Sequence, residues 1–173
     1  MEIMETERLQ LFEWSEDTLY GLQSFLQDAE VMYAYEHSFS DQEVRSWLEW
    51  NLSNYKELGY GLWGLKEKAS GTIIGECGLT HQEIAGTSYL EIGYHLRKDF
   101  WHKGYAAEAA EYCKNYAFEK LRAPSVVSII RDTNLSSMRV AIRNGMLPTE
   151  RFVKHYQGID MPHYLFEVKN NRI

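Results

Sequence analysis

The stretch from Arg97 to Ala109, RKDFWHKGYAAEA, decides how the rest of this sequence is interpreted. Before it, Tyr89 to Leu96 has the composition and spacing of a strand. Beyond its glycine, small apolar residues recur at helical spacing, which predicts a helix over Tyr105 to Lys120 whose small face lies close to a sheet. The stretch therefore contains a loop that joins a strand to a helix.

The loop is locally cationic in an acidic chain, since Arg97, Lys98 and Lys103 outnumber Asp99. A helix N-terminus exposes unpaired N–H groups, and Gly104 has no side chain to keep a ligand from the backbone. The loop is therefore a candidate phosphate site, although an ordinary basic loop would have the same composition. No Walker loop and no G-x-G-x-x-G dinucleotide signature occurs in the sequence.

A second informative stretch runs from Asn134 to Met146, NLSSMRVAIRNGM, after a buried strand at Val126 to Ile130. It predicts a helix over Asn134 to Asn144 that ends at Gly145, with Ser137 in its first turn. Helix capping alone would explain Asn134. Two helices that follow neighbouring parallel strands also begin at the same edge of the sheet, where α/β proteins tend to bind ligands.

The remaining segments complete a mixed α/β order with no linker, so we expect a single domain over residues 1–173. The strand Tyr89–Leu96, the helix and the strand Val126–Ile130 form a βαβ unit. The other expected elements are strands at Arg8–Trp14, Leu62–Lys66 and Thr72–Leu79, helices at Asp17–Leu26 and from Ser40 to about Leu58, and a hairpin of Phe152–Tyr156 with His163–Val168. The strands at Leu62, Thr72 and Tyr89 are expected to form an antiparallel meander, with turns at 68–71 and 85–88.

Composition narrows the class of protein further. The chain has 173 residues, 45% of them hydrophobic and 14% aromatic, which excludes disordered and low-complexity classes. A formal charge of −7 argues against binding nucleic acid or an anionic membrane. The two cysteines are not spaced as a disulfide framework, and neither a signal peptide nor a membrane span is evident, so we expect a cytoplasmic protein. His81, His155 and His163 are not spaced as a metal site, and we expect no metal.

In order and spacing, five stretches resemble the GNAT N-acetyltransferases, and within them the RimJ/RimL-like branch that acetylates protein N-terminal amines and related amino groups. They are Glu5–Leu9 (ETERL), Ile74–Leu79 (IGECGL), Glu91–Tyr94 (EIGY), Trp101–Ala109 (WHKGYAAEA) and Asn134–Met146. The resemblance implies an α/β fold with a curved, mostly antiparallel mixed sheet, splayed between two central parallel strands, and acetyl-CoA in the gap.

By the same resemblance, the loop from Trp101 to Ala106 binds the CoA pyrophosphate through the backbone N–H groups of His102, Lys103, Gly104, Tyr105 and Ala106. The strand residues Tyr94, His95 and Leu96 border the cofactor, with the backbone of Tyr94 and Leu96 pairing with the pantetheine amides.

The sequence departs from the family pattern at three positions. Trp101 stands where the superfamily has Gln or Arg, as is usual for this branch, and Met146 replaces a Phe. His102 stands where Gly is usual, so the loop requires that its backbone angles tolerate a side chain.

Acetyl transfer to an amine requires a proton acceptor and stabilisation of the departing thiolate. The resemblance places Glu91 near the acceptor amine, either as the general base or as an acid that orients the substrate. The tyrosine that many superfamily members use as an acid corresponds to Ala141 here, so Ser137 becomes the candidate for contacting the sulfur. Asn134 then binds the pantetheine arm or caps its helix. His95 is either a proton relay or a packed strand residue.

The acceptor is expected to be a protein N-terminus or a small amine, and the protein a monomer or homodimer. An aromatic and acidic stretch, Tyr33, Tyr35, Glu36, His37, Trp47 and Trp50, either receives a cationic amine or forms an amphipathic helix with a buried Trp seam. The competing function is a CoA-binding sensor that has lost catalysis. A phosphotransferase is disfavoured, because no Walker loop or magnesium-binding carboxylate is visible.

Overall fold

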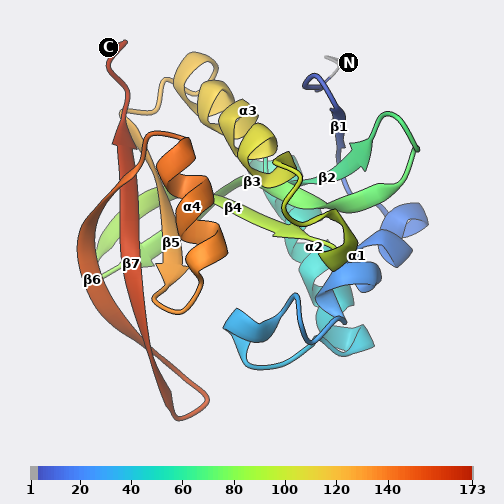
Figure 1. The fold of residues 1–173 in the computed structure, drawn as a ribbon, viewed down its shortest axis with the longest axis horizontal. Helices are drawn as coiled ribbons and strands as arrows, with labels where there is room; N and C mark the ends of the chain where they lie inside the picture. Colours follow the sequence, from blue (N-terminus) through green and yellow to red (C-terminus); the bar gives the residue numbers. More distant parts are fainter. Residues whose placement is uncertain (1–3, 173) are drawn as a thin grey trace. The chain divides into compact units, whose positions relative to one another are not determined.

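The structure is a computed structural model that describes residues 4–172 (Figure 1). The helices are α1 (Leu19–Leu26), α2 (Asp41–Leu58), α3 (Tyr105–Glu119) and α4 (Leu135–Arg143), with short 3-10 helices η1 (Glu16–Thr18), η2 (Tyr33–Tyr35) and η3 (Lys98–Phe100). The strands are β1 (Leu9–Phe12), β2 (Leu62–Glu67), β3 (Ile73–Ile84), β4 (Thr87–Leu96), β5 (Ser125–Arg131), β6 (Leu147–Tyr156) and β7 (Ile159–Lys169).

The strands form one mixed sheet in the order β1-β2-β3-β4-β5-β7-β6. The pairs β1/β2, β2/β3, β5/β7 and β6/β7 are antiparallel, whereas β4 and β5 are parallel. In the pairing of β4 with β5, Glu91 lies opposite Val127. At the residues that follow, Ser128 Oγ donates to the Ile92 carbonyl at 2.9 Å. The predicted α/β class and its βαβ unit are confirmed.

Contacts within the chain divide it into two compact units, which we describe separately. The first comprises the residues up to Gly78 together with Tyr94–Ala109, and the second comprises Leu79–Gly93 and the residues from Ala110 onward. A single domain over the whole chain stays a prediction.

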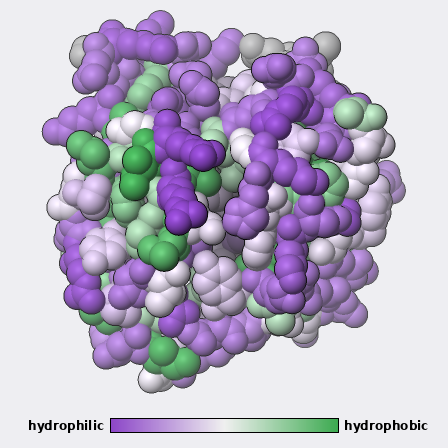
Figure 2. Space-filling model, in the orientation of Figure 1, coloured by the Kyte–Doolittle hydropathy of each residue, from purple (hydrophilic) through white to green (hydrophobic). Residues whose placement is uncertain are grey.

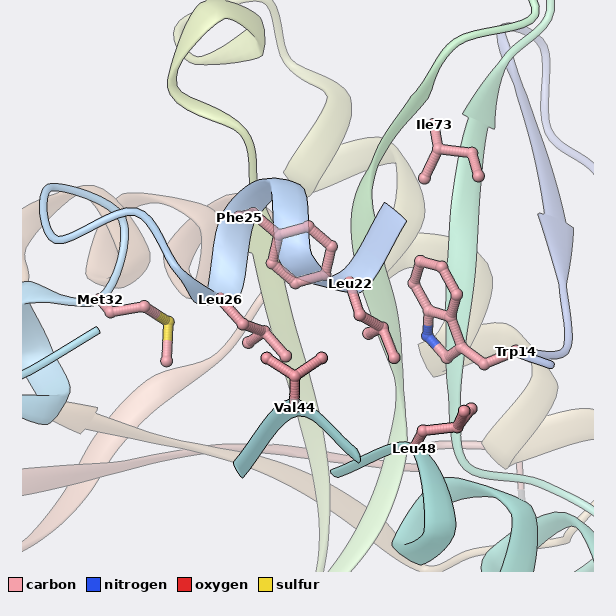
Figure 3. Packing of buried hydrophobic residues seen from close by; sticks show 8 residues of the cluster. All are labelled: Trp14, Leu22, Phe25, Leu26, Met32, Val44, Leu48 and Ile73. Atoms are coloured by element: carbon pink, nitrogen blue, oxygen red, sulfur yellow. The ribbon is translucent and has the colours of Figure 1, made fainter. Parts of the chain in front are cut away.

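The core of the first unit lies between α1, α2 and the strands (Figure 3). Leu22, Phe25 and Leu26 of α1 face Val44 and Leu48 of α2. Trp14, Met32 and Ile73 complete the cluster, and every member is buried. The two helices thus bury the apolar stripes that their 3.6-residue periodicity predicts.

The ends of α2 follow from its sequence. Ser40 and Glu43 form the predicted capping box, in which Ser40 Oγ accepts from the Glu43 N–H at 3.2 Å and the Glu43 carboxylate accepts from the Ser40 N–H at 2.8 Å. Gly59, with φ of 78°, ends the helix in the left-handed conformation. By contrast, α1 begins at Leu19 rather than at Asp17, since the preceding turn is 3-10.

In the second unit, β5 pairs with β7, and α4 lies near β5 (Figure 1). Lys114 of α3 donates to the Asn144 carbonyl at the end of α4, at 3.1 Å. Gly145, with φ of 82°, follows that end as predicted. Met146, which replaces the family's Phe, is buried.

Both hairpins of this unit are longer than predicted. We expected strands that stop at Leu79 and restart at Tyr89, but β3 continues to Ile84 and β4 begins at Thr87. Ala85 and Gly86, with φ of 48° and 81°, make a two-residue turn, and both have the positive φ of tight hairpin turns.

The C-terminal hairpin shows the same difference. It was expected over Phe152–Tyr156 and His163–Val168, and instead comprises all of β6 and β7 around Gln157 and Gly158, whose φ values are 49° and 75°.

Hydrophilic side chains cover most of the face drawn in Figure 2, with hydrophobic ones in small groups. Among residues 4–172, no helix is long and apolar enough to cross a membrane.

The core predicts a difference between two leucines of α2. Leu48 is fully buried, whereas Leu52 is 39% exposed. Replacing Leu48 with Ala removes buried methyl groups and leaves a cavity, so Leu48→Ala should lower the free energy of unfolding by about 2–5 kcal/mol. Leu52→Ala should lower it by less than about 1 kcal/mol. Urea denaturation measures both, and equal losses would contradict the assigned faces of α2.

Candidate active site

The loop after β4 has an unusual backbone. Its two left-handed residues are His102, with φ of 60°, and Gly104, with φ of 82°. His102, which stands where the family usually has glycine, therefore adopts the left-handed conformation that glycine takes easily. For a residue with a side chain this conformation costs about 1–3 kcal/mol. Trp101 fixes the start of the loop, because its Nε1–H donates to the Leu96 carbonyl at 2.9 Å.

The loop leaves backbone donors available. At the start of α3, the Glu108 N–H donates to the Gly104 carbonyl at 3.1 Å. Within the described residues, the N–H groups from His102 to Ala106 donate to no other group of the protein. Unpaired N–H groups at the start of a long helix favour an anion, so this loop fits the predicted pyrophosphate. A Cβ at Gly104 would be strained by its φ and would meet Arg8 Nη2 at 3.4 Å.

Thr6, Arg8 and Glu108 form a hydrogen-bonded cluster, the N-terminal brace, that holds this loop. The sequence analysis did not predict it. Arg8 donates through Nη1 to the Lys103 carbonyl at 2.9 Å and through Nε to Glu108 Oε2 at 2.6 Å. The other oxygen, Glu108 Oε1, accepts from the Thr6 hydroxyl at 2.5 Å and from the Arg8 N–H at 2.8 Å. Burial alone would raise the pKa of Glu108, but the hydrogen bonds from Thr6 and Arg8 outweigh it and hold the pKa below its ordinary value.

The end of β4 lies against β3 in the first unit. The Arg97 N–H donates to the Ile74 carbonyl at 2.8 Å. Gly75 permits close packing there, since a Cβ at this position would come within 2.1 Å of the His95 carbonyl oxygen. Leu96 is buried, and Tyr94 and His95 are partly buried. Tyr94, His95, Leu96 and the loop from Trp101 to Ala106 therefore all belong to this unit.

The side chain of His95 has partners that the sequence did not reveal. Its Nδ1 lies 2.9 Å from Glu76 Oε1, and its Nε2 lies 3.1 Å from the Tyr35 hydroxyl oxygen. Glu76 is fully buried and accepts a hydrogen bond from the indole N–H of Trp14 and another from that of Trp47, each at 3.1 Å. An acid within the otherwise buried strand of IIGECGL was the signal that could have identified Glu76.

Two residues of the predicted aromatic and acidic stretch contact these groups: Tyr35 contacts His95, and Trp47 contacts Glu76. Tyr33, Tyr35 and Trp50 are exposed by 37% or more, whereas Trp47 is partly buried and packs against Trp50 with ring centroids 5.1 Å apart. The packed seam is therefore confirmed for Trp47, and the reception of a cationic amine by the three accessible rings stays a prediction.

Glu91 lies in the second unit, at the position where β4 pairs with Val127 of β5. Its side chain is partly buried. Desolvation raises the pKa of Glu91 to about 7, and the positive charge of Lys154 acts in the opposite direction. A carboxyl group that titrates near neutrality suits proton transfer at neutral pH.

Asn134 and Ser137 also lie in the second unit. Asn134 is the N-cap of α4, and its side-chain oxygen accepts from the Ser137 N–H at 3.1 Å. The capping role of Asn134 is therefore confirmed. Ala141, which stands where many relatives have a tyrosine, is buried, so α4 presents no phenol at this position.

Two other features do not coincide with these residues. A surface hollow of about 420 Å³ is lined by Ser24, Asp28, Arg97, Lys98 and Asp99. Its Arg97 and Lys98 are paired with Asp99 and Glu30. Within residues 4–172, no group of three or more His, Cys, Asp or Glu side chains is arranged to hold a metal ion.

Comparison with known proteins identifies the family of this chain. The family profile of the acetyltransferase (GNAT) domain matches residues 8–147. The uncharacterized protein YkkB of Bacillus subtilis is 36% identical over 129 residues, which cover 75% of this chain and 74% of that protein.

Solved structures show the same fold. A GNAT-family acetyltransferase from Bacillus anthracis superposes with a TM-score of 0.82 at 19% identity, covering 99% of this chain and 100% of that one. RimL, a ribosomal alpha-N-protein acetyltransferase in complex with coenzyme A, superposes with a TM-score of 0.79 at 15% identity, covering 99% of this chain and 100% of that one. The profile spans well over half of the sequence, and the chain therefore belongs to the GNAT family of acetyltransferases.

Proposed function

We propose that this GNAT acetyltransferase is a RimJ/RimL-like enzyme that acetylates a protein N-terminal amine or a small primary amine. The observation that carries the proposal is the loop from His102 to Ala106, whose backbone N–H groups are unused by the rest of the described protein. Acetyl-CoA, when bound, supplies a thioester whose acetyl group is transferred. The likeness to RimL, which binds coenzyme A, supports the cofactor.

The chain's own residues divide into a binding set and a reacting set. The loop N–H groups hold the pyrophosphate, with the charge of Lys103 beside them. The backbone of Tyr94 and Leu96 pairs with the pantetheine arm, beside His95. Asn134 holds the start of α4 in place.

Glu91 and Ser137 are the proposed reacting groups. With a pKa of about 7, Glu91 is ionised in part of the molecules at neutral pH and accepts a proton from the amine nitrogen. The hydroxyl of Ser137, in the first turn of α4, donates to the sulfur as it leaves. A cytoplasmic location and an acceptor of basic character are consistent with the acidic chain.

A sensor that binds CoA without catalysis is the second candidate, because Ala141 removes the usual acid. Calorimetry with acetyl-CoA, together with CoA thiol release in the presence of N-terminal peptides, polyamines and aminoglycosides, separates the two. Binding with acceptor-dependent release supports the enzyme. Binding without release for any acceptor would favour the sensor, and absence of binding would contradict both.

The loop predicts different outcomes for substitutions at Gly104 and at His102. Gly104→Val places a β-branched residue at a φ of 82° and should weaken acetyl-CoA binding about 10- to 100-fold, since the strain is of order 1–3 kcal/mol. His102→Gly relieves the strain at φ of 60° and should change the affinity by less than about threefold. Calorimetry measures both, and equal affinity in the two variants would contradict the loop assignment.

Glu91→Gln should lower kcat by about 10²- to 10⁴-fold while the affinity for acetyl-CoA stays unchanged. Because the folded-state pKa of Glu91 is raised, its protonated form favours folding. That contribution is fully present below the ordinary carboxyl pKa and is lost as the pH rises through about 7.

Glu91→Gln, which has no charge at this position, should therefore have a higher free energy of unfolding than the wild type at pH 8 and not at pH 4, as measured by urea denaturation. Glu150→Gln, at an exposed position of β6, is the control and should change neither kcat nor the free energy of unfolding. An unaltered kcat for Glu91→Gln would remove Glu91 from the mechanism.

For Ser137→Ala we expect kcat to fall by about 10- to 100-fold with acetyl-CoA binding retained, because a donor to the developing thiolate is lost. The adjacent and exposed Ser136 provides the matched control, Ser136→Ala, which should keep full activity. Steady-state thiol release measures both. Equal rates for the two variants would show that Ser137 does not contact the sulfur.

A further inference from the structure

Three polar side chains of the first unit lie in a line that runs from the core to the surface. Glu76 is at the buried end, with no exposed area on its side chain. His95 follows, with its side chain 12% exposed, and Tyr35 is at the outer end, 38% exposed. The links are 2.9 Å from Glu76 Oε1 to His95 Nδ1 and 3.1 Å from His95 Nε2 to the Tyr35 hydroxyl.

The surroundings of Glu76 favour a carboxylate that only accepts hydrogen bonds. The indole N–H of Trp14 donates to Oε2, and that of Trp47 donates to Oε1. A buried carboxylate is expensive unless several donors satisfy it, and here two indoles and an imidazole do so. An indole N–H only donates, so among these three partners the His95 ring alone can both donate and accept a hydrogen bond.

This arrangement fixes the tautomer of His95. Since Glu76 accepts, Nδ1 carries the proton, and Nε2 is left with a lone pair that accepts from the Tyr35 hydroxyl. Aromatic rings enclose the imidazole: Phe25 of α1 stacks at 6.2 Å, and Trp47 of α2 meets it edge-on at 6.1 Å between centroids. The titratable groups that face His95 are thus Glu76 from β3 and Tyr35 from η2, while α1 and α2 present uncharged rings.

Tyr35 is the outer end of the line, and its position suits exchange with a ligand. It lies on the single turn η2, which ends at Glu36 with a positive φ of 68°. An amine that takes the place of the Tyr35 hydroxyl at Nε2 would meet a base that is already oriented by a buried carboxylate. The accessible ring of Tyr35 and the neighbouring Trp50 offer faces for a cation.

We propose that Glu76, His95 and Tyr35 form a proton relay in which His95 Nε2 removes the first proton from the acceptor ammonium. The proposal rests on the proposed function. His95 is the catalytic residue, and Glu76 is a positioning residue that holds the ring. Once the deprotonated amine has left Nε2, the Tyr35 hydroxyl returns to it, accepts the proton from Nε2 and releases its own proton to solvent.

The proton balance of acetyl transfer leaves room for this second acceptor. When an ammonium becomes an amide, an N–C bond forms, a C–S bond breaks and the nitrogen gives up two protons. One proton ends on the CoA sulfur and one in solvent. His95 removes the first, before the amine attacks, and the relay carries it to solvent. Glu91 then accepts the second proton, which leaves the nitrogen as the N–C bond forms.

The location of His95 agrees with this role. It stands in β4 between Tyr94 and Leu96, whose backbone is proposed to run beside the pantetheine arm. Successive side chains of a strand point to opposite faces, and that of His95 points to the α1 and α2 side, where the contacts with Phe25 and Trp47 occur.

The test exploits the difference between two kinds of amine. An enzyme with a working base can use the ammonium form, whereas one without it must wait for free amine from solution. For His95→Gln, kcat/KM should therefore rise about tenfold per pH unit up to the acceptor's own pKa. The loss at pH 7 should be at least tenfold larger for an alkyl polyamine, with pKa about 10.4, than for a peptide N-terminus, with pKa about 7.7–8.0.

His155→Gln is the matched control. His155 Nδ1 contacts Asp160 Oδ1 at 2.5 Å in the same kind of pair, but both side chains are about three-quarters exposed. This variant should leave both amines unaffected. Tyr35→Phe should give a smaller loss than His95→Gln, with the same preference for the less basic amine.

A second readout does not depend on turnover. In the ¹⁵N NMR spectrum of the free protein, the neutral imidazole of His95 should carry its proton on Nδ1. Glu76→Gln should shift the proton toward Nε2, which distinguishes a positioning residue from a merely structural one. If that variant does not fold, the wild-type spectrum and His95→Gln still decide.

The outcomes separate the two claims. An equal loss for both amines in His95→Gln, or a wild-type His95 protonated on Nε2, would overturn the relay and leave the proposed function intact. A wild-type protein that acetylates neither amine would overturn the proposed function and the relay with it. A pKa-dependent loss together with the Nδ1–H tautomer would support both.

Discussion

The hydrogen bonds to the buried carboxylate of Glu76 are the constraint on which the first unit depends. Through Trp14, Trp47 and His95, they tie β3 to the segment after β1, to α2 and to the end of β4. Removing one partner of such a buried charge typically costs about 3–5 kcal/mol. The core of Figure 3 packs beside it, with Trp14 belonging to both. The interaction that orders this unit is thus the same one that orients His95.

A second constraint acts on the loop that follows β4. The left-handed backbone of His102 is sparsely populated in proteins and persists only when its surroundings hold it. Here Trp101 anchors one side of the loop, and Arg8 anchors the other through the Lys103 carbonyl. Glu108 completes the brace by binding Arg8, and within the described residues the loop's N–H groups from His102 to Ala106 donate to no other group of the protein. The strained loop and the N-terminal brace therefore depend on each other.

Local patterns in the sequence predicted most of the fold. The capping box at Ser40, the alanine stripe of α3 and the Asn134 cap each act over a few residues, so they can be recognised directly. The hairpins around Ala85–Gly86 and Gln157–Gly158 were predicted with strands that are too short, because neither turn has the Asn-Gly or Asp-Gly pair that signals a two-residue turn. The pairs Glu76–His95 and Arg8–Glu108 lie 19 and 100 residues apart in sequence, and only the tertiary fold brings them together.

The most direct test of the role of Glu76 is the hydrogen exchange of the indole N–H groups, measured by ¹H–¹⁵N NMR. Trp14 and Trp47 donate to a buried carboxylate, so their indole protons should exchange only when the unit opens. Trp50, whose side chain lies on the same helix as Trp47 but is exposed, provides the internal reference for fast exchange. Slow exchange at Trp14 and Trp47 with fast exchange at Trp50 is the predicted result. Exchange of Trp14 and Trp47 as fast as that of Trp50 would contradict the account.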